Sequence, residues 1–234
     1  MHQLNNISQA LLDLIFPITC LGCQKEGPWL CADCCAKLPR TKNQCPFCNQ
    51  PNNNSQTCPR CAAKNSLSGA LSCFAYQHPL VKSLIHGAKY RYWKSILPQL
   101  AQQMAKKVEQ NNKIINIKNS WVITPVPLHR SKHKIRGYNQ SLLLAQGISA
   151  YLDAPLSRDL VRSTNTQAQA KLGKQARFAN VNGVFSLKSN IDFSSKSVII
   201  IDDVFTTGAT LDSAARICQE HGAKKVWGLT FAHG

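Results

Sequence analysis

The sequence is poor in acidic residues and contains no long hydrophobic run. Its 234 residues include 11 Asp and Glu against 28 Lys and Arg, which gives a formal charge of +17. No stretch approaches the roughly 18–20 apolar residues of a membrane-spanning helix, so we expect no transmembrane segment. The shortage of acids is uneven, because none occurs between Asp33 and Glu109. A positive electrostatic field of this kind favours the binding of polyanions such as nucleic acid, phosphates or an acidic membrane surface. The simpler alternative is that the charge serves only to keep the protein soluble.

Two common phosphate-binding signatures are also absent. Neither GxxxxGK[ST] nor GxGxxG occurs, which argues against a Walker A loop and against a dinucleotide fold. The first sixteen residues lack the basic start of a secretion signal, and Leu4, Ile7 and Leu11 follow helical spacing. We therefore expect an amphipathic helix there and a cytoplasmic protein, whose thiols stay reduced.

Cysteine is abundant and concentrated at one end of the chain. Nine of the 11 cysteines precede Ser66, and eight of these nine form four CxxC pairs. Two CxxC pairs complete one tetrahedral site, so the spacing predicts two zinc ions, with iron–sulfur ligation as the rival. Short loops favour pairing in sequence order, although a cross-braced arrangement remains open. In sequence order the ligands are Cys20, Cys23, Cys31 and Cys34 at one site, and Cys45, Cys48, Cys58 and Cys61 at the other.

These zinc ions are expected to be structural, because the protein supplies all four ligands and leaves no position for water. Residues 1–66 have too few apolar residues for a packed core, so metal should hold them together as a small zinc-ribbon domain. We expect replacement of Cys45 or Cys58 by Ser to unfold this domain and to spare any ligand site elsewhere.

Residues 67–234 have the pattern of an α/β domain. Strands alternate with helices along the chain, which predicts a mainly parallel sheet flanked by helices. Ligands of such sheets bind at the carboxyl ends of the strands. We expect strands at 70–75, 121–126, 183–187, 198–201 and 225–231, and helices at 80–85, 96–108, 140–151 and 209–221.

The stretch VIIIDDVFTTGATL combines a buried strand with a turn suited to phosphate. Its β-branched run, Val198 to Ile201, predicts a central strand that ends at two acids, Asp202 and Asp203. The Thr- and Gly-rich turn after them opens a helix whose first amides can hold an anion. The carboxylates suit sugar hydroxyls or a hydrated Mg²⁺. A sugar with a 5′-phosphate suits both parts of this stretch, because its hydroxyls match the carboxylates and its phosphate matches the turn. The turn residues are Thr206, Thr207, Gly208, Ala209 and Thr210.

This stretch resembles the phosphoribosyl pyrophosphate loop of type I phosphoribosyltransferases. Together with the amino-terminal CxxC array, it resembles the ComF family of competence proteins over essentially the whole chain. Further motifs that match are Leu84-Ile85-His86, Lys89-Tyr90, TPVPLHRSKHKIRGYNQS from Thr124 to Ser141, Arg162 to Gln167, Arg177 and Asn180.

The resemblance implies roles for several segments. Asp202 and Asp203 would hold ribose hydroxyls with Mg²⁺, and the turn after them would hold the 5′-phosphate. Residues 162–180 would form the hood that selects the acceptor in the enzymes. A mobile basic loop would meet pyrophosphate, with Pro127, Leu128, His129, Arg130, Lys134 and Arg136 as its residues.

Two basic stretches are candidates for nucleic acid. Mixtures of cations and aromatic rings bind single strands, although such rings often pack in a core while the cations reach solvent. The basic loop is equally compatible with a solvated surface. The candidates are Lys89, Tyr90, Arg91, Tyr92, Trp93 and Lys94, and then Arg130, Lys132, Lys134 and Arg136.

Two functions are compatible with these features. The resemblance implies a cytoplasmic competence protein that handles incoming single-stranded DNA, together with other DNA-processing proteins, and binds phosphoribosyl pyrophosphate. The alternative is an active phosphoribosyltransferase that moves the 5-phosphoribosyl group to a base or amine and releases pyrophosphate. The sequence shows no acceptor pocket, so it leaves open whether the protein is an enzyme.

Overall fold

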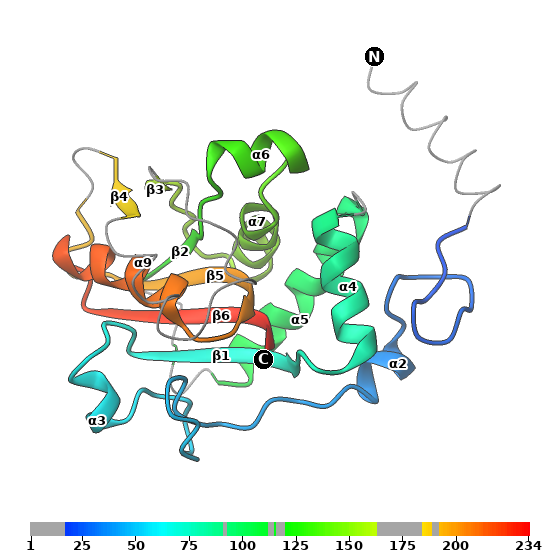
Figure 1. The fold of residues 1–234 in the computed structure, drawn as a ribbon, viewed down its shortest axis with the longest axis horizontal. Helices are drawn as coiled ribbons and strands as arrows, with labels where there is room; N and C mark the ends of the chain where they lie inside the picture. Colours follow the sequence, from blue (N-terminus) through cyan, green and yellow to red (C-terminus); the bar gives the residue numbers. More distant parts are fainter. Residues whose placement is uncertain (1–16, 91–92, 112–114, 116–119, 163–183, 189–191) are drawn as a thin grey trace.

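The computed structural model describes residues 17–90, 93–111, 115, 120–162, 184–188 and 192–234 (Figure 1). The segment of the expected amino-terminal helix, Arg91, Tyr92 and all of the expected hood after Arg162 therefore lie outside the described residues. None of the described helices has both the length and the apolar character that crossing a bilayer requires.

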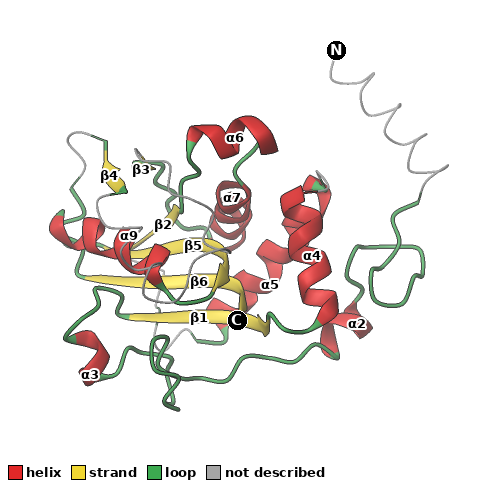
Figure 2. Ribbon diagram, in the orientation of Figure 1, coloured by secondary structure: helices red, strands yellow, loops and turns green. Residues whose placement is uncertain are grey.

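A four-stranded parallel sheet forms the centre of the molecule (Figure 2). Its order is β1-β6-β5-β2, and each neighbouring pair is parallel. The strands are β1 (Gly69–Ala75), β2 (Trp121–Pro125), β5 (Ser197–Phe205) and β6 (Lys225–His233). A separate antiparallel pair joins β3 (Leu160–Arg162) and β4 (Phe185–Leu187). The predicted parallel sheet is confirmed.

Helices cover both faces of this sheet. Helices α5 (Leu97–Glu109) and α7 (Gln140–Leu152) pack on one face, and α9 (Ala209–Glu220) packs on the other. Helix α4 (Pro79–Tyr90) follows β1, and a 3-10 turn, η1 (Lys94–Ile96), leads to α5. Helix α6 (Arg130–Arg136) lies between β2 and α7, where the sequence suggested a loop. Short helices α2 (Ala32–Ala36) and α3 (Pro59–Ala62) belong to the cysteine-rich segment.

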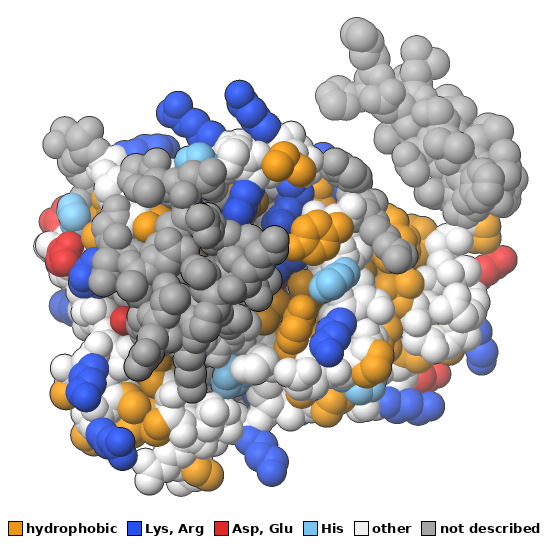
Figure 3. All heavy atoms as spheres, viewed as in Figure 1, with side chains coloured by type: hydrophobic (Ala, Val, Ile, Leu, Met, Phe, Trp, Pro, Cys, Tyr) orange, Lys and Arg blue, Asp and Glu red, His pale blue; other side chains and the backbone are white. Residues whose placement is uncertain are grey.

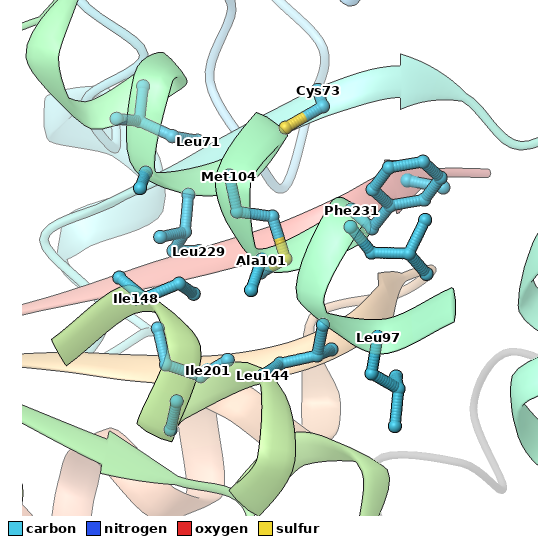
Figure 4. Close-up of a cluster of buried hydrophobic side chains, with 14 of the residues drawn as sticks. Leu71, Cys73, Leu97, Ala101, Met104, Leu144, Ile148, Ile201, Leu229 and Phe231 are labelled. Carbon is cyan, nitrogen blue, oxygen red and sulfur yellow. The ribbon is translucent and has the colours of Figure 1, made fainter. Parts of the chain in front are cut away.

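The core follows from the two-residue period of the strands. Ile199 and Ile201 of β5 point into the cluster under α5 and α7, whereas Val198 and Ile200 point into the cluster under α9. Figure 4 shows the first cluster, in which side chains of α5 and α7 meet those of β1, β5 and β6. A strand buried on both faces requires the continuous apolar run that the sequence shows.

The cysteine-rich segment is joined to the sheet domain by apolar contacts and by bridges. Leu30, Cys35 and Leu38 are buried in the same cluster as α5 and α7. Isolated bridges pair Gln56 with Gly69 at the start of β1, and Arg40 with Phe74 near its end. From residue 17 on, the segment therefore buries apolar side chains in the core of the sheet domain. The domain boundary at residues 66 and 67 stays a prediction.

Candidate functional site

The eight cysteines of the CxxC pairs gather into two groups of four, in sequence order. Within each group, the sulfur atoms lie within 4.8 Å of one another. Sγ of Cys23 is 3.8 Å from Sγ of Cys31, and Sγ of Cys48 is 3.7 Å from Sγ of Cys58. Tetrahedral zinc with Zn–S bonds of about 2.3 Å separates its sulfurs by about 3.8 Å. Both groups therefore fit a structural zinc ion, and the sequential pairing is confirmed.

The two groups share a hydrogen-bond pattern that favours thiolates. The backbone N–H of Cys31 donates to Sγ of Cys20, and that of Cys58 donates to Sγ of Cys45, each over 3.4 Å. Burial raises the pKa of Cys20 and of Cys45, but backbone hydrogen bonds outweigh it and lower each pKa to about 6. Each site is thus prepared to bind a cation, as expected of a duplicated zinc ribbon.

The paired carboxylates lie at the carboxyl end of β5 and are held by α4 and α7. Nζ of Lys89 is 2.9 Å from Oδ2 of Asp203, which also accepts a hydrogen bond of 3.3 Å from Gln140. Asp202 accepts 2.9 Å hydrogen bonds from the Ser141 hydroxyl and from the N–H of Asp203. One carboxylate is therefore engaged in an internal ion pair, and the other is oriented by neutral donors.

The charges of this group of side chains shift the pKa of Asp202 and that of Lys89. Burial and the charge of Asp203 raise the pKa of Asp202 to about 6, against the opposing effects of Lys89 and Ser141. Burial lowers the pKa of Lys89, but the two aspartates outweigh burial, so the net shift is upward. Lys89 therefore stays charged and neutralises one of the two acids.

The Thr- and Gly-rich turn after β5 is open. Gly208 precedes α9 with φ of +79°, a left-handed conformation that favours glycine. A Cβ atom at this position would lie 2.7 Å from the Phe205 ring and 2.9 Å from the Phe47 ring. Thr206 is exposed, and the Thr207 hydroxyl accepts a long hydrogen bond of 3.4 Å from Ala209 N–H. The conformation at Gly208 therefore requires glycine, directly before the first amides of α9.

Two adjoining cavities open on either side of the carboxylates. The first, of about 170 Å³, is lined by the turn. The second, of about 230 Å³, is lined by Pro127, Leu128 and basic side chains from α6 and β3. Both cavities share a wall of four residues, Lys89, Asp202, Asp203 and Thr210.

Basic side chains crowd the second cavity. Lys132 and Arg136 of α6 and Arg162 of β3 line it together with Lys89. Burial, and then the charges of Arg162, Arg136 and Lys89, lower the pKa of Lys132. Burial also lowers the pKa of Arg162. Mutual repulsion of this kind is relieved when an anion enters, so the second cavity is suited to a highly charged anion.

The structure divides the predicted basic loop into residues that line the cavity and residues that do not. Pro127, Leu128 and Arg136 line the second cavity. His129 instead accepts a hydrogen bond from Ser131 N–H and caps α6. Arg130 and Lys134 are exposed on α6 and do not line either cavity. The expected loop was wrong because its HRSKHKIRG run has an N-cap at His129 and a C-terminal Gly137 with φ of +75°.

In the aromatic and basic stretch, the described residues also differ in whether they contact the rest of the protein or face solvent. Trp93 stacks on Trp29 with ring centroids 4.4 Å apart, and Lys94 lies over the Tyr138 ring. Lys89 faces the carboxylates, as described above. Only Tyr90 presents its ring to solvent, with 65% of its surface exposed. Arg91 and Tyr92 lie outside the described residues.

Among the site residues, Gln140 and Ser141 received no role from the sequence, and they form the first turn of α7. Arg162, the first residue of the expected hood, ends β3 and lines the second cavity. Gln140 and Ser141 are polar yet buried at the start of a helix. Two polar residues at the first turn of a predicted helix were the available signal. Phe47 and Phe205 carried no signal, because their contact joins two distant segments.

Comparison with known proteins gives two family matches along the chain. Residues 139–232 match the phosphoribosyl transferase domain, and residues 11–79 match the double zinc ribbon domain. These matches and the sheet topology agree with the predicted α/β fold and its amino-terminal zinc ribbon.

Relatives that match nearly the whole chain carry names connected with DNA. The DNA utilization protein YhgH of Escherichia coli (strain K12) is 30% identical over 92% of this chain and 98% of that protein. Competence protein F of Haemophilus influenzae is 30% identical over 91% of this chain and 90% of that protein. Among solved structures, a purine phosphoribosyltransferase from Pyrococcus horikoshii is 20% identical over 58% of this chain and 70% of that chain, with a TM-score of 0.35.

Proposed function

Because the chain belongs to the family of DNA utilization protein YhgH and competence protein F, we propose that it is a cytoplasmic competence protein that handles incoming single-stranded DNA and binds phosphoribosyl pyrophosphate with Mg²⁺. The names of these relatives support the DNA part of the proposal. The charge of +17 supports it as well, since a basic chain attracts a polyanionic strand.

One observation carries the ligand part of the proposal: two cavities suited to anions meet at a pair of carboxylates. A pentose with phosphate at one end and pyrophosphate at the other has anions on both sides of a ring of hydroxyls. Asp202 and Asp203 would accept the hydroxyl hydrogen bonds, and the turn from Thr206 to Thr210 would hold the 5′-phosphate. Lys132, Arg136 and Arg162 would surround the pyrophosphate.

Lys89, which is paired with Asp203, is placed to take part in binding. When ribose hydroxyls bind Asp203, Lys89 would stay within reach of the anion in either cavity, because it lines both. Mg²⁺ would supply further neutralisation of the pyrophosphate charge, and carboxylate oxygens are ligands that it prefers. The residues present therefore fit a magnesium-bound pyrophosphate.

Isothermal titration of the zinc-loaded chain with phosphoribosyl pyrophosphate and Mg²⁺ tests the ligand site. We expect binding by the wild type and a loss of at least about tenfold in affinity for Asp202→Asn combined with Asp203→Asn, since charge-assisted hydrogen bonds each contribute about 1.5–3 kcal/mol. Glu220→Gln, an exposed carboxylate at the far end of α9, is the matched control and should bind normally. No heat from the wild type would exclude the ligand proposal.

Transfer of the 5-phosphoribosyl group to a base or amine is the alternative function. The basic cavity favours it, because clustered cations stabilise pyrophosphate as a leaving group. Release of pyrophosphate in the presence of candidate bases, without affinity for single-stranded DNA, would support the enzyme over the DNA-handling protein.

A further inference from the structure

A row of aromatic and basic side chains crosses the exposed side of α4 and ends at the second cavity. We name it the α4 row; it consists of Tyr76, Lys82, His86, Tyr90 and Arg136. Lys82 lies over the Tyr76 ring at 5.8 Å, and the Tyr76 hydroxyl is 3.5 Å from Nε2 of His86. The rings of His86 and Tyr90 meet edge to face at 5.6 Å, and Arg136 lies over Tyr90 at 5.5 Å. The contacts therefore run from Lys82 to Tyr76, from Tyr76 to His86, and through Tyr90 to Arg136.

The buried core does not include Lys82, His86 or Tyr90, whereas Tyr76 packs against it. Lys82, His86 and Tyr90 are four residues apart, which places them on one side of the helix. The opposite side of α4 supplies its buried residues, Val81, Leu84, Ile85, Gly87 and Ala88. His86 is exposed, and Tyr90 remains 65% exposed although Arg136 lies over its ring. An exposed tyrosine held between a histidine and an arginine is a surface that a ligand can use.

The charge of the row has one sign. The sequence contains no Asp or Glu from residue 34 to residue 108, which includes all of α4. In Figure 3, hydrophobic, histidine and basic side chains follow one another on the surface over α4, with further basic side chains toward α6. The row is continuous with the site, because Tyr90 and Arg136 also line the second cavity.

We propose that the α4 row is a binding track for single-stranded nucleic acid, which stacks its bases on Tyr90 and His86 and places its phosphates near Lys82 and Arg136. This inference rests on the proposed DNA-handling function and assigns a surface to it. Aromatic rings between cations match a strand whose unpaired bases are free to stack. A duplex keeps its bases inside, so it can use only the cations of the row. The track would lead the strand to the edge of the second cavity.

Fluorescence anisotropy of a labelled oligothymidylate, titrated with the zinc-loaded chain at several salt concentrations, tests the track. Tyr90→Leu should lower the affinity about fivefold or more and leave the salt dependence unchanged, because it removes stacking and no charge. Lys82→Ala should reduce the steepness of log affinity against log salt by about one, which corresponds to the loss of one phosphate contact. Tyr90→Trp should restore the affinity, since it restores a stacking ring.

Matched substitutions elsewhere serve as controls. Tyr151→Leu removes an exposed tyrosine of α7, and Lys225→Ala removes an exposed lysine at the start of β6. Both should bind the oligothymidylate as the wild type does. An oligouridylate arm identifies which sugar the track prefers, and binding of either strand with the expected variant pattern supports the track.

Other outcomes overturn the proposal. Wild-type affinity for the strand together with normal binding by Tyr90→Leu would remove the track and leave the DNA-handling function intact. The same conclusion follows if a duplex binds as tightly as the single strand. It also follows if the substitutions of Tyr90 and Lys82 weaken binding to anionic phosphatidylserine vesicles and leave binding to the strand unchanged. Failure of the wild type to bind any single strand would instead exclude the DNA-handling function itself.

Discussion

The two neighbouring carboxylates of the site differ in how the protein holds them. Asp203 is paired with Lys89, whereas Asp202 receives its hydrogen bonds from Ser141 and from backbone N–H. An ionised Asp202 is therefore beside another negative charge with only partial compensation. This arrangement lowers the stability of the fold, and destabilising groups of this kind are common in binding sites.

The raised pKa of Asp202 predicts that Asp202→Asn stabilises the protein at high pH. Since the folded pKa of about 6 lies above the ordinary value, the ionised form costs stability above pH 6, and protonation removes that cost as the pH falls toward 4. We expect a gain of about 1–3 kcal/mol in the free energy of unfolding at pH 8, which disappears near pH 4. Denaturant unfolding at the two pH values measures it.

Asp192→Asn is the control of opposite sign for this prediction. Hydrogen bonds from the side chain and backbone of Ser194 lower the pKa of Asp192, so its ionised form contributes stability above its ordinary pKa and loses it as the pH falls. Asp192→Asn should therefore destabilise the protein at pH 8. If Asp202→Asn is equally destabilising at both pH values, Asp202 matters for its hydrogen bonds rather than for its charge.

Residue types at fixed spacing were predictable, but the partners that orient them were not. The spacing of the CxxC pairs determined all eight zinc ligands, and the run before Asp202 and Asp203 placed these acids at the end of a strand. Ser141 and Gln140 are 61 and 63 residues away from the acids that they contact. No local pattern reports such a contact, since it depends on how α7 packs against β5.

At the scale of elements, the second zinc ribbon supports the turn that precedes α9. The ring of Phe47, between Cys45 and Cys48, meets the ring of Phe205 edge to face at 6.4 Å. The linker after the ribbon is held by α9 as well, because Asp212 accepts hydrogen bonds of 2.8 and 2.9 Å from the N–H groups of residues 66 and 67. We therefore revise the expectation that loss of a ligand of the second zinc spares the ligand site.

Phe47→Ala should weaken the binding of phosphoribosyl pyrophosphate, although Phe47 itself lines neither ligand cavity. Loss of an aromatic pair, at about 0.5–1.5 kcal/mol, predicts a decrease of about twofold to tenfold in affinity, because the turn loses its support. Titration calorimetry measures the decrease, and Phe47→Tyr should recover most of it. Leu21→Ala, the matched change in the first zinc knuckle, should bind normally, and an equal decrease there would indicate general destabilisation.

At the scale of the whole molecule, the zinc ribbons and the sheet domain share one core. Leu30, Cys35 and Leu38 of the cysteine-rich segment are buried with α5 and α7, and Trp29 stacks on Trp93. The backbone N–H of Leu30 also donates to the Gln99 side chain of α5. Elements that share buried surface unfold together, so the two parts are expected to be one cooperative unit.

Scanning calorimetry of the zinc-loaded chain should therefore give one unfolding transition whose calorimetric and van't Hoff enthalpies agree. We expect metal analysis to find two zinc ions per chain, in line with the two Cys₄ groups. Removal of zinc with a strong chelator should lower the transition temperature and weaken ligand binding together. Two separate transitions in the zinc-loaded chain would show that the ribbons and the sheet domain unfold independently.

The sequence alone determined the chemistry that short segments encode. Ligand spacing in the CxxC pairs, the apolar run of β5 and the turn after it are written within a few residues, and neighbouring residues are close in any fold. Tertiary structure decided which distant groups meet: Lys89 with Asp203, Phe47 with Phe205, and Tyr90 with Arg136. These contacts join segments far apart in the chain, so they exist only because the helices and ribbons pack against a common sheet.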